Sequence, residues 1–281
     1  MKLALLLGAA LVATASPAAA KIPWKRIKGA SDLMANEQRL AGEIMSKART
    51  YYGCKGTVSK CLGARGKASR NAWRLARYIV FLVGKGLSEK EVLKVVSLRR
   101  KSAKPKKRKR IKVAGTPYLG PLNAPVQIVE YADFRCGHCA AVAPMLKQLL
   151  AKYKGKVVLF FKPYPLRQGA AVRAAQASLA AHLQGKFWPM HKRLFDNPSM
   201  HDAAGLTKLA KAAGLDVGKF QAAMQSRALL KIIDKNKREG LKLGITGTPT
   251  LYFNGKKYRL RKDLMHLQER IEEELEMLGK I

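Results

Sequence analysis

The sequence predicts an α/β protein whose mixed sheet carries an inserted block of helices and is preceded by a small all-helical unit. Three observations predict it. The segment 126–161 alternates strand, helix and strand, and the segment 250–278 reads strand, strand and helix, with helical spacing between the two. Upstream, residues 21–98 hold three helical patterns and no strand pattern. We therefore expect two folded units in the 281 residues.

Residues 1–20 have the features of a secretory signal peptide. Lys2 is a positive start, Leu3–Ala15 is an apolar run of about 13 residues, and Ala18-Ala19-Ala20 is a small-residue cleavage pattern. The alternative, an uncleaved membrane anchor, would need roughly 20 apolar residues. We therefore expect an exported, periplasmic protein in a compartment where disulfides persist.

The helical unit, residues 21–98, comes next. Apolar spacing predicts helices over 30–50 and 68–83. Ser88 and Glu91 form a capping-box pattern that opens a third helix.

Cys54 and Cys61 lie between the first two of these helices. On one continuous helix they would be roughly 10 Å apart, too far to bond, but Gly53 and Gly56 indicate a loop. We expect a structural disulfide that stabilises a small unit. The alternative is a second redox pair, which is disfavoured because neither thiol has an evident helix N-terminus.

The chain is strongly basic, with a formal net charge of +37. The excess is densest at 99–112, where ten of fourteen residues are Lys or Arg, and we expect a linker there. The segment Arg99–Lys112 should attract anionic lipid headgroups or an acidic protein. Export makes nucleic acid the weakest candidate partner. The alternative is a solvated linker with no binding role.

The second domain, 113–281, alternates strands and helices. Several helices are expected between about 169 and 243. The other expected elements are a strand at Val126–Tyr131, a helix at Cys136–Tyr153, a strand at Val157–Phe161, a strand at Thr250–Phe253, a turn at Asn254-Gly255, a strand at Lys257–Leu260 and a helix at Asp263–Leu278.

The tetrapeptide Cys136-Gly137-His138-Cys139 stands between an expected strand and an expected helix. A thiol at a helix N-terminus is stabilised as thiolate, the species that attacks disulfides. Cys139, one turn later, can resolve a mixed disulfide, and His138 can stabilise the Cys136 thiolate. The alternative for this pair, half of a zinc site, lacks two further ligands at workable spacing, so we expect no metal.

Glu130 interrupts an otherwise apolar strand. Period-two counting puts it on the same face as Val126 and Ile128, which indicates burial. A buried carboxyl has a raised pKa and can relay a proton to or from Cys139. The alternative is a strand-end Glu that reaches solvent.

Residues from about 116 to 281 resemble the DsbA-like branch of the thioredoxin superfamily. The resemblance lies in Ala124–Phe134 leading into Cys136–Cys139, in Gly185-Lys186-Phe187-Trp188, and in Gly247–Gly255. It implies a thioredoxin-like fold with an inserted helical subdomain.

The resemblance also assigns residues. It implies that Pro249 is cis and lies against the cysteine pair, and that Thr248 offers backbone hydrogen bonds to an extended substrate peptide. Glu130 matches the family's buried carboxylate, and Pro144 matches the proline that kinks the active-site helix. DsbA proper usually has Pro-His between its cysteines and Val before the cis-proline, so Gly137-His138 and Thr248 leave the direction of catalysis open.

Three functions follow as hypotheses. The first is an exported thiol–disulfide oxidoreductase that forms or exchanges disulfides in thiol-containing envelope proteins. It needs no cofactor, because its disulfide carries two electrons, and it needs a membrane redox partner to recycle it. With no dimerisation stalk evident, we expect a monomer.

The second is a reductase or isomerase for a narrow client set such as apocytochrome c. The segment Gly84–Leu93 is similar to the helical domain of CcmH-type thiol reductases, although their cysteines are spaced differently. The third is a non-catalytic basic binding or chaperone module.

Overall fold

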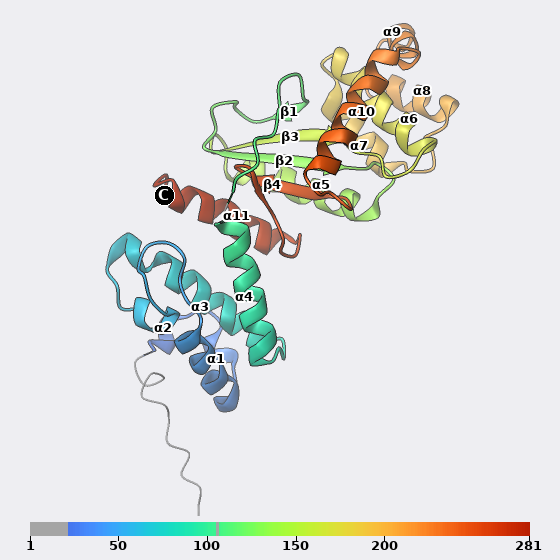
Figure 1. Ribbon diagram of the computed structural model, residues 1–281. Helices are drawn as coiled ribbons and strands as arrows, with labels where there is room; N and C mark the ends of the chain where they lie inside the picture. Colours follow the sequence, from blue (N-terminus) through green and yellow to red (C-terminus); the bar gives the residue numbers. More distant parts are fainter. Residues whose placement is uncertain (1–21, 105–106) are drawn as a thin grey trace, which may run out of the picture. The chain divides into compact units, whose positions relative to one another are not determined.

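The structure, a computed structural model, describes residues 22–104 and 107–281 (Figure 1). The predicted signal peptide, 1–20, lies outside the described residues, as do two residues of the predicted linker. The chain divides into two compact units, Met1–Arg100 and Lys101–Ile281. The division falls inside the segment predicted as linker, and the domain boundaries stay a prediction.

The first unit is built from helices. Amphipathic helices α1 and α3 pack their apolar faces together, and Ile44, Met45, Leu75 and Ile79 are fully buried. Its elements are the 3-10 turns η2 (Trp24–Arg26), η3 (Ala30–Asp32) and η4 (Gly66–Ser69), and the helices α1 (Ala35–Lys47), α2 (Val58–Cys61), α3 (Arg70–Val83) and α4 (Glu89–Ala103).

Helix α4 runs further than the sequence predicts. It ends at Ala103, five residues beyond the expected end of the helical unit at 98. The reason is that Arg, Lys and Ala favour helix, and the pattern ends only where Pro105 disfavours the α conformation of the residue before it. The first part of the expected linker is therefore helical.

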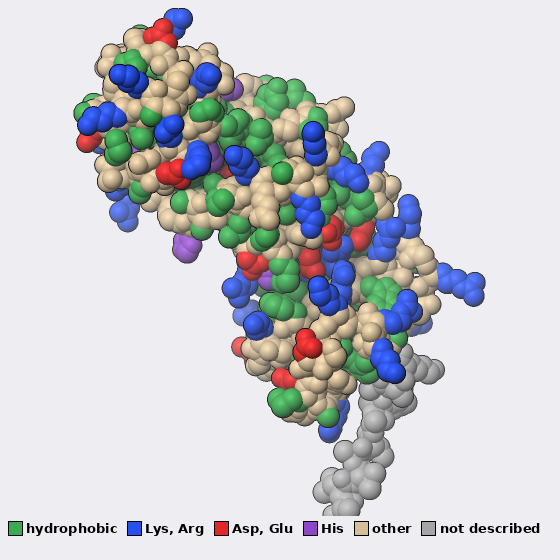
Figure 2. Space-filling view, turned by 180° about the vertical axis from the view of Figure 1, so that it is seen from behind, with side chains coloured by type: hydrophobic (Ala, Val, Ile, Leu, Met, Phe, Trp, Pro, Cys, Tyr) green, Lys and Arg blue, Asp and Glu red, His purple; other side chains and the backbone are tan. Residues whose placement is uncertain are grey.

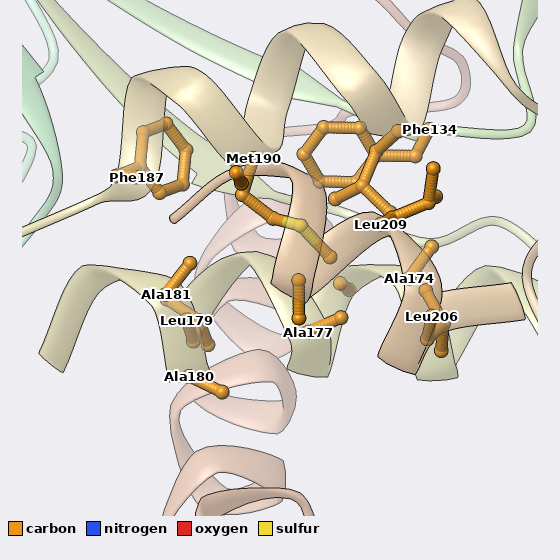
Figure 3. Packing of buried hydrophobic residues seen from close by; sticks show 14 of the residues in the cluster. Phe134, Ala174, Ala177, Leu179, Ala180, Ala181, Phe187, Met190, Leu206 and Leu209 are labelled. Atoms are coloured by element: carbon orange, nitrogen blue, oxygen red, sulfur yellow. The ribbon is translucent and has the colours of Figure 1, made fainter. Parts of the chain in front are cut away.

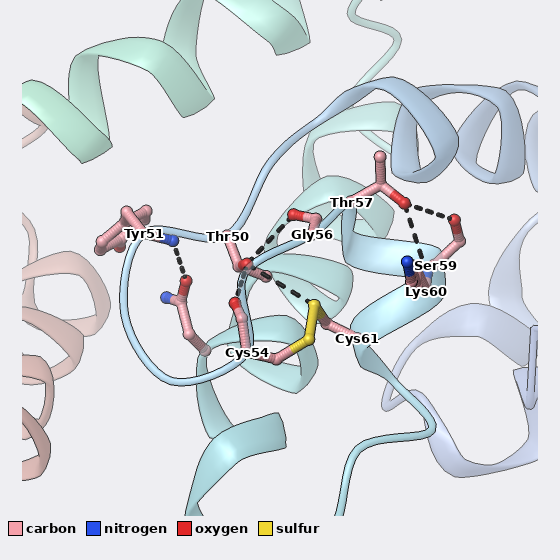
Figure 4. Close-up of a disulfide and its surroundings, with 9 residues drawn as sticks. Thr50, Tyr51, Cys54, Gly56, Thr57, Ser59, Lys60 and Cys61 are labelled. Atoms are coloured by element: carbon pink, nitrogen blue, oxygen red, sulfur yellow. Dashed lines mark hydrogen bonds between the residues drawn. A yellow bond between two sulfur atoms is a disulfide. The ribbon is translucent and has the colours of Figure 1, made fainter.

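Cys54 and Cys61 form a disulfide, with their Cα atoms 5.7 Å apart (Figure 4). Cys61 closes the short helix α2 and is fully buried. The Thr50 hydroxyl lies within hydrogen-bonding distance of the Cys54 and Gly56 carbonyl oxygens, so the loop is also fastened by polar contacts. The structural role of this disulfide stays a prediction.

Replacing Cys54 and Cys61 together by alanine should lower the free energy of unfolding by about 2.5 kcal/mol, because the disulfide limits the unfolded chain over a short loop. Chemical denaturation under non-reducing conditions measures this loss. An unchanged unfolding midpoint would show that the disulfide is not a structural staple.

The second unit contains a five-stranded mixed sheet in the order β1-β3-β2-β4-β5. Strands β2 and β3 are parallel, and the other neighbouring pairs are antiparallel. The strands are β1 (Tyr118–Leu119), β2 (Val126–Ala132), β3 (Val157–Pro163), β4 (Thr250–Phe253) and β5 (Lys256–Lys257). Helix α5 (Gly137–Lys152) connects β2 to β3 as a crossover, as the βαβ pattern predicts.

Five helices stand between β3 and β4 as an inserted subdomain. They are α6 (Ala170–Leu183), α7 (Phe187–Asp196), α8 (Ala203–Ala212), α9 (Val217–Met224) and α10 (Arg227–Lys242). Small alanines along α6 let it approach its neighbours, and Met190 and Phe187 of α7 belong to the same buried cluster as Phe134 (Figure 3). The last helix is α11 (Leu264–Met277).

Two expectations about the sheet need correction. The strand predicted at Lys257–Leu260 is misplaced: β5 covers only Lys256–Lys257. The Tyr258 N–H still donates to the Leu251 carbonyl oxygen of β4 at 2.9 Å, and the chain then turns, with the Tyr258 hydroxyl donating to the Arg261 carbonyl oxygen at 2.7 Å. The short strand β1 was not predicted, because two residues carry no periodicity. The α/β class and the helical insertion are confirmed.

Candidate functional site

Cys136 is the N-cap residue of α5. Its backbone is extended, with φ −96° and ψ 115°. Its carbonyl oxygen accepts the backbone N–H groups of Cys139 and Ala140 at 3.0 and 3.1 Å. The thiol therefore stands at the unpaired N–H groups and the positive dipole end of the helix.

The loop before β4, which holds Thr248 and Pro249, contacts the Cys136 thiol. The Cys136 Sγ donates to the carbonyl oxygen of Thr248 at 3.4 Å, and the Thr248–Pro249 peptide bond is cis. The contact joins residues 112 positions apart in the chain. The cis geometry and the closeness to the cysteine are those that the resemblance implies.

The two thiols of the pair differ in acidity. Partial burial alone would raise the pKa of Cys136, but hydrogen bonding with Thr248, Cys139 and the His138 backbone outweighs it and holds the pKa below its usual value. Cys139 is fully buried, and this burial raises the pKa of its thiol strongly. The exposed sulfur is thus the better nucleophile, and the buried one holds its proton.

Asp133 shapes the loop between β2 and α5. Its buried carboxylate accepts the backbone N–H groups of Arg135 and Leu166, each at 2.8 Å. The Cys136 N–H in turn donates to the Asp133 carbonyl oxygen at 3.0 Å. These bonds fix the entry into α5 and with it the position of Cys136.

A groove of about 480 Å³ adjoins the site. His138, which is exposed, and the Thr248–Pro249 loop both line it. The other lining residues come from α5 and from the segment before α11: Ala141, Val142, Leu260, Arg261, Lys262 and Asp263. The groove is open enough to receive an extended peptide beside Pro249.

Glu130 is buried in β2, with 1% of its surface exposed, as the period-two count predicts. In register it lies between Phe161 of β3 and Leu251 of β4. No protein group in the described part of the chain is hydrogen-bonded to either of its carboxyl oxygens. Burial raises the pKa of this carboxyl to about 8, so it is mostly protonated at neutral pH.

Glu130 should make folding stability depend on pH, since the pKa of its carboxyl is 4.5 ordinarily and about 8 in the folded protein. Between these values the folded protein keeps a proton that the unfolded chain has released. The free energy of unfolding therefore falls as pH rises, by on the order of 5 kcal/mol in total.

Replacing Glu130 by glutamine should remove this dependence. We expect the variant and the wild type to be similarly stable near pH 4.5, and the variant to be clearly more stable at pH 8. Denaturant titrations at both pH values measure the difference, and identical pH slopes for the two proteins would contradict a buried, titrating Glu130.

The structure brings all six predicted active-site residues together: Cys139, His138, Thr248 and Pro249 lie around Cys136, and Glu130 lies behind them in the sheet. The Cys54–Cys61 pair belongs to the other unit. The sequence did not single out His191, which lines a cavity together with Glu130. The available signal was a stripe of aromatic residues along α7. In residues 22–104 and 107–281, no group of three His, Cys, Asp or Glu side chains could hold a metal ion.

A family model described as thioredoxin matches residues 112–273, which is more than half of the chain. Among curated proteins, the chain is similar to the Na(+)/H(+) antiporter NhaA 1 of Mycolicibacterium gilvum (strain PYR-GCK), with 31% identity over 144 residues. That match covers 50% of this chain and 23% of the antiporter. The chain therefore spans less than a quarter of the length of this relative.

Solved structures of thiol-disulfide exchange proteins share the fold. The thiol-disulfide exchange protein alpha-DsbA2 from Wolbachia pipientis is 26% identical with a TM-score of 0.52, covering 56% of this chain and 86% of that one. Oxidised BdbD from Bacillus subtilis is 25% identical with a TM-score of 0.53, covering 60% of this chain and 97% of that one. The chain belongs to the thioredoxin family, is similar to DsbA-like thiol–disulfide oxidoreductases, and carries a basic helical extension before its thioredoxin-like fold.

Proposed function

We propose that this protein is exported and forms or exchanges disulfides in envelope proteins through Cys136 and Cys139. One observation carries the proposal: an acidic, half-exposed thiol at a helix N-terminus touches the cis-proline loop and precedes a buried thiol of raised pKa by three residues. This asymmetry suits one sulfur for exchange with substrates and the other for resolution.

In the oxidising direction, a substrate thiolate attacks the Cys136 sulfur of the Cys136–Cys139 disulfide. That bond breaks, a mixed disulfide forms, and Cys139 leaves as a thiolate that takes the proton of Glu130. A second substrate thiolate attacks the substrate sulfur of the mixed disulfide and releases Cys136 as thiolate. The substrate loses two electrons and the enzyme gains them.

The remaining site residues adjust the acidity of Cys136 and position the substrate peptide. His138 stabilises the Cys136 thiolate, and the backbone of Thr248 beside Pro249 pairs with the extended substrate in strand-addition fashion. A lowered pKa of Cys136 stabilises the reduced pair and so favours oxidation of substrates. The Gly137-His138 dipeptide and Thr248 are typical of disulfide isomerases, which makes isomerisation the second candidate.

The setting of the enzyme is part of the proposal. A signal peptide at 1–20 would deliver it to the periplasm, where a membrane redox partner recycles it and no cofactor is needed. None of the described helices is long and apolar enough to cross a membrane. We propose that it acts as a monomer and that Cys54–Cys61 is a structural staple.

The basic surface gives it further partners. Lys and Arg side chains outnumber acidic ones over the visible face in Figure 2. The exposed Lys and Arg side chains of the segment Arg99–Lys112 are proposed to contact anionic lipid or an acidic protein. Arg99 itself is buried, with its guanidinium over the Tyr78 ring, and takes no part. Such binding should weaken with rising salt, whereas exchange at Cys136 should not depend on that contact.

The test is transfer of the disulfide itself. The oxidised protein is mixed with a reduced peptide that holds two cysteines, and the reaction is quenched with acid. Free thiols are then alkylated and counted by mass spectrometry. We expect one peptide disulfide for each Cys136–Cys139 disulfide consumed. No transfer, with the pair intact, would overturn the proposed function.

A further inference from the structure

A second cavity lies on a different face of α5 from the groove beside Pro249. It has a volume of about 220 Å³ and shares no lining residue with that groove. It is enclosed by the sheet, α5 and α7. Its lining residues are Leu119, Glu130, Ala140, Ala143, Pro144, Lys147, Leu159, Trp188, His191, Lys192, Phe195 and Asp196.

Two polar side chains without a protein partner line this cavity. Glu130 has both carboxyl oxygens unsatisfied by the described residues, and the Nε2 of His191 is likewise without a hydrogen-bond partner there. His191 is 8% exposed and is held by rings on several sides, among them Phe134, Phe161 and Phe195. Buried polar groups are normally satisfied, so these two call for water.

Helix α5 leaves one backbone carbonyl beside the cavity without its usual helical donor. Pro144 has no backbone N–H, so it cannot donate to the carbonyl of Ala140 one turn earlier, and both residues line the cavity. A carboxyl, an imidazole nitrogen and a carbonyl oxygen are the two to four partners that a buried water needs. The volume is ample for several water molecules.

The cavity also reaches solvent. Lys147 of α5 and Lys192 and Asp196 of α7 line it and are exposed. The Trp188 indole, which forms part of the wall, donates to the Tyr118 carbonyl oxygen at 2.8 Å, which fixes its orientation. The same cavity is thus lined by exposed charged side chains and by the buried carboxyl.

We propose that this cavity is the route by which Glu130 exchanges protons with bulk water, and that His191 is a positioning residue that holds water within it. The inference rests on the proposed function, because Glu130 needs such a route only if it serves Cys139 as a proton donor and acceptor. Beyond that function, it names the route of the proton and the residues that form this route.

Proton balance requires a route of this kind. When the Cys139 thiolate takes the proton of Glu130, a carboxylate remains in the apolar interior, and it must regain a proton before the next turnover. The titratable and charged groups on the helices packed against Glu130 are Cys139 and Lys147 from α5, and His191, Lys192 and Asp196 from α7. The β3 and β4 neighbours of Glu130, Phe161 and Leu251, carry no charge.

His191 suits water binding rather than proton transfer. Its burial lowers the pKa of the imidazole to about 3, so the ring stays neutral throughout the working range of pH. A neutral ring can donate or accept a hydrogen bond and carries no charge to disturb Glu130. Replacing it by phenylalanine keeps the aromatic packing and removes only the ring nitrogens.

The test fills the cavity without touching the reacting groups. Ala143→Leu places three more carbon atoms in it, and Ala151→Leu is the matched control, the same change at an exposed position of α5 outside the cavity. Turnover with the two-cysteine peptide is followed from pH 6 to 9, together with the reduction potential. His191→Phe is measured in the same way.

We expect Ala143→Leu to slow turnover about tenfold at pH 7, a part of what general acid–base catalysis contributes, with its pH profile approaching that of Glu130→Gln. His191→Phe should also slow turnover and change its pH profile in the same direction, and Ala151→Leu should match the wild type in both. The reduction potential of Ala143→Leu should be unchanged, because a route affects rates and not end states.

Two outcomes overturn the inference, and they differ from failure of the function. If Glu130→Gln slows turnover but Ala143→Leu and His191→Phe do not, the proton takes another path. If Ala143→Leu slows turnover only by lowering stability or shifting the potential, the effect is structural. If Glu130→Gln has no effect on turnover, the proposed role of Glu130 itself fails.

Discussion

Replacing Cys136 by serine is expected to reduce thiol–disulfide exchange by about 10³-fold or more, because a serine hydroxyl does not attack a disulfide. The remaining thiol, Cys139, is fully buried and its pKa is raised, so it cannot take over from the surface. Turnover of the two-cysteine peptide measures the loss, and circular dichroism confirms that the variant is folded.

Cys139→Ser is the matched control, one helical turn away. This variant should still attack, because Cys136 keeps its place at the N-terminus of α5, but it should stall as a mixed disulfide with its substrate. Mass spectrometry detects that adduct. If Cys136→Ser instead accumulated the adduct and Cys139→Ser did not, the two roles assigned here would be exchanged.

Replacing Lys256 by methionine should lower the free energy of unfolding by about 3 kcal/mol, because removing one partner leaves a buried charge behind. The Lys256 ammonium lies 2.9 Å from the Glu274 carboxylate, with 3% and 2% of the side chains exposed. Arg270 also reaches Glu274, at 2.8 Å, so part of the compensation survives. Denaturant unfolding measures the loss.

The matched control is Lys192→Met. Lys192 also pairs with a carboxylate, that of Asp196, but 72% and 51% of these side chains are exposed. Exposed pairs contribute at most about 1 kcal/mol, so this variant should be close to the wild type. Equal losses for both substitutions would mean that the Lys256–Glu274 pair is not buried in solution.

Local patterns predicted most of the second unit. Strand β4 was expected at its observed residues, and helix α5 was expected within one residue of its observed ends, because strand and helix spacing are read directly from the chain. Strand β5 was misplaced because the apolar alternation of Tyr258 and Leu260 continues beyond the last residue that bonds to β4. Periodicity records which side chains are buried and not what they pair with.

For the active site too, local patterns predicted some features and missed those that depend on contacts between distant parts of the chain. The helix N-terminal position of Cys136 followed from the strand-to-helix junction, and the burial of Glu130 followed from period two. The contact of Cys136 with Thr248 joins distant parts of the chain, so it came only from the resemblance. The cavity was out of reach, because it exists only where α7 packs over β2 and α5.

The reduction potential of the Cys136–Cys139 pair tests the central claim most directly. The purified protein is equilibrated with glutathione buffers, and both cysteine pairs are quantified by alkylation and mass spectrometry. We expect a single two-electron transition of Cys136–Cys139 near −120 to −180 mV, with Cys54–Cys61 staying oxidised. A potential at or below about −230 mV would make the protein a reductant, and a pair that does not exchange would contradict an enzymatic role at this site.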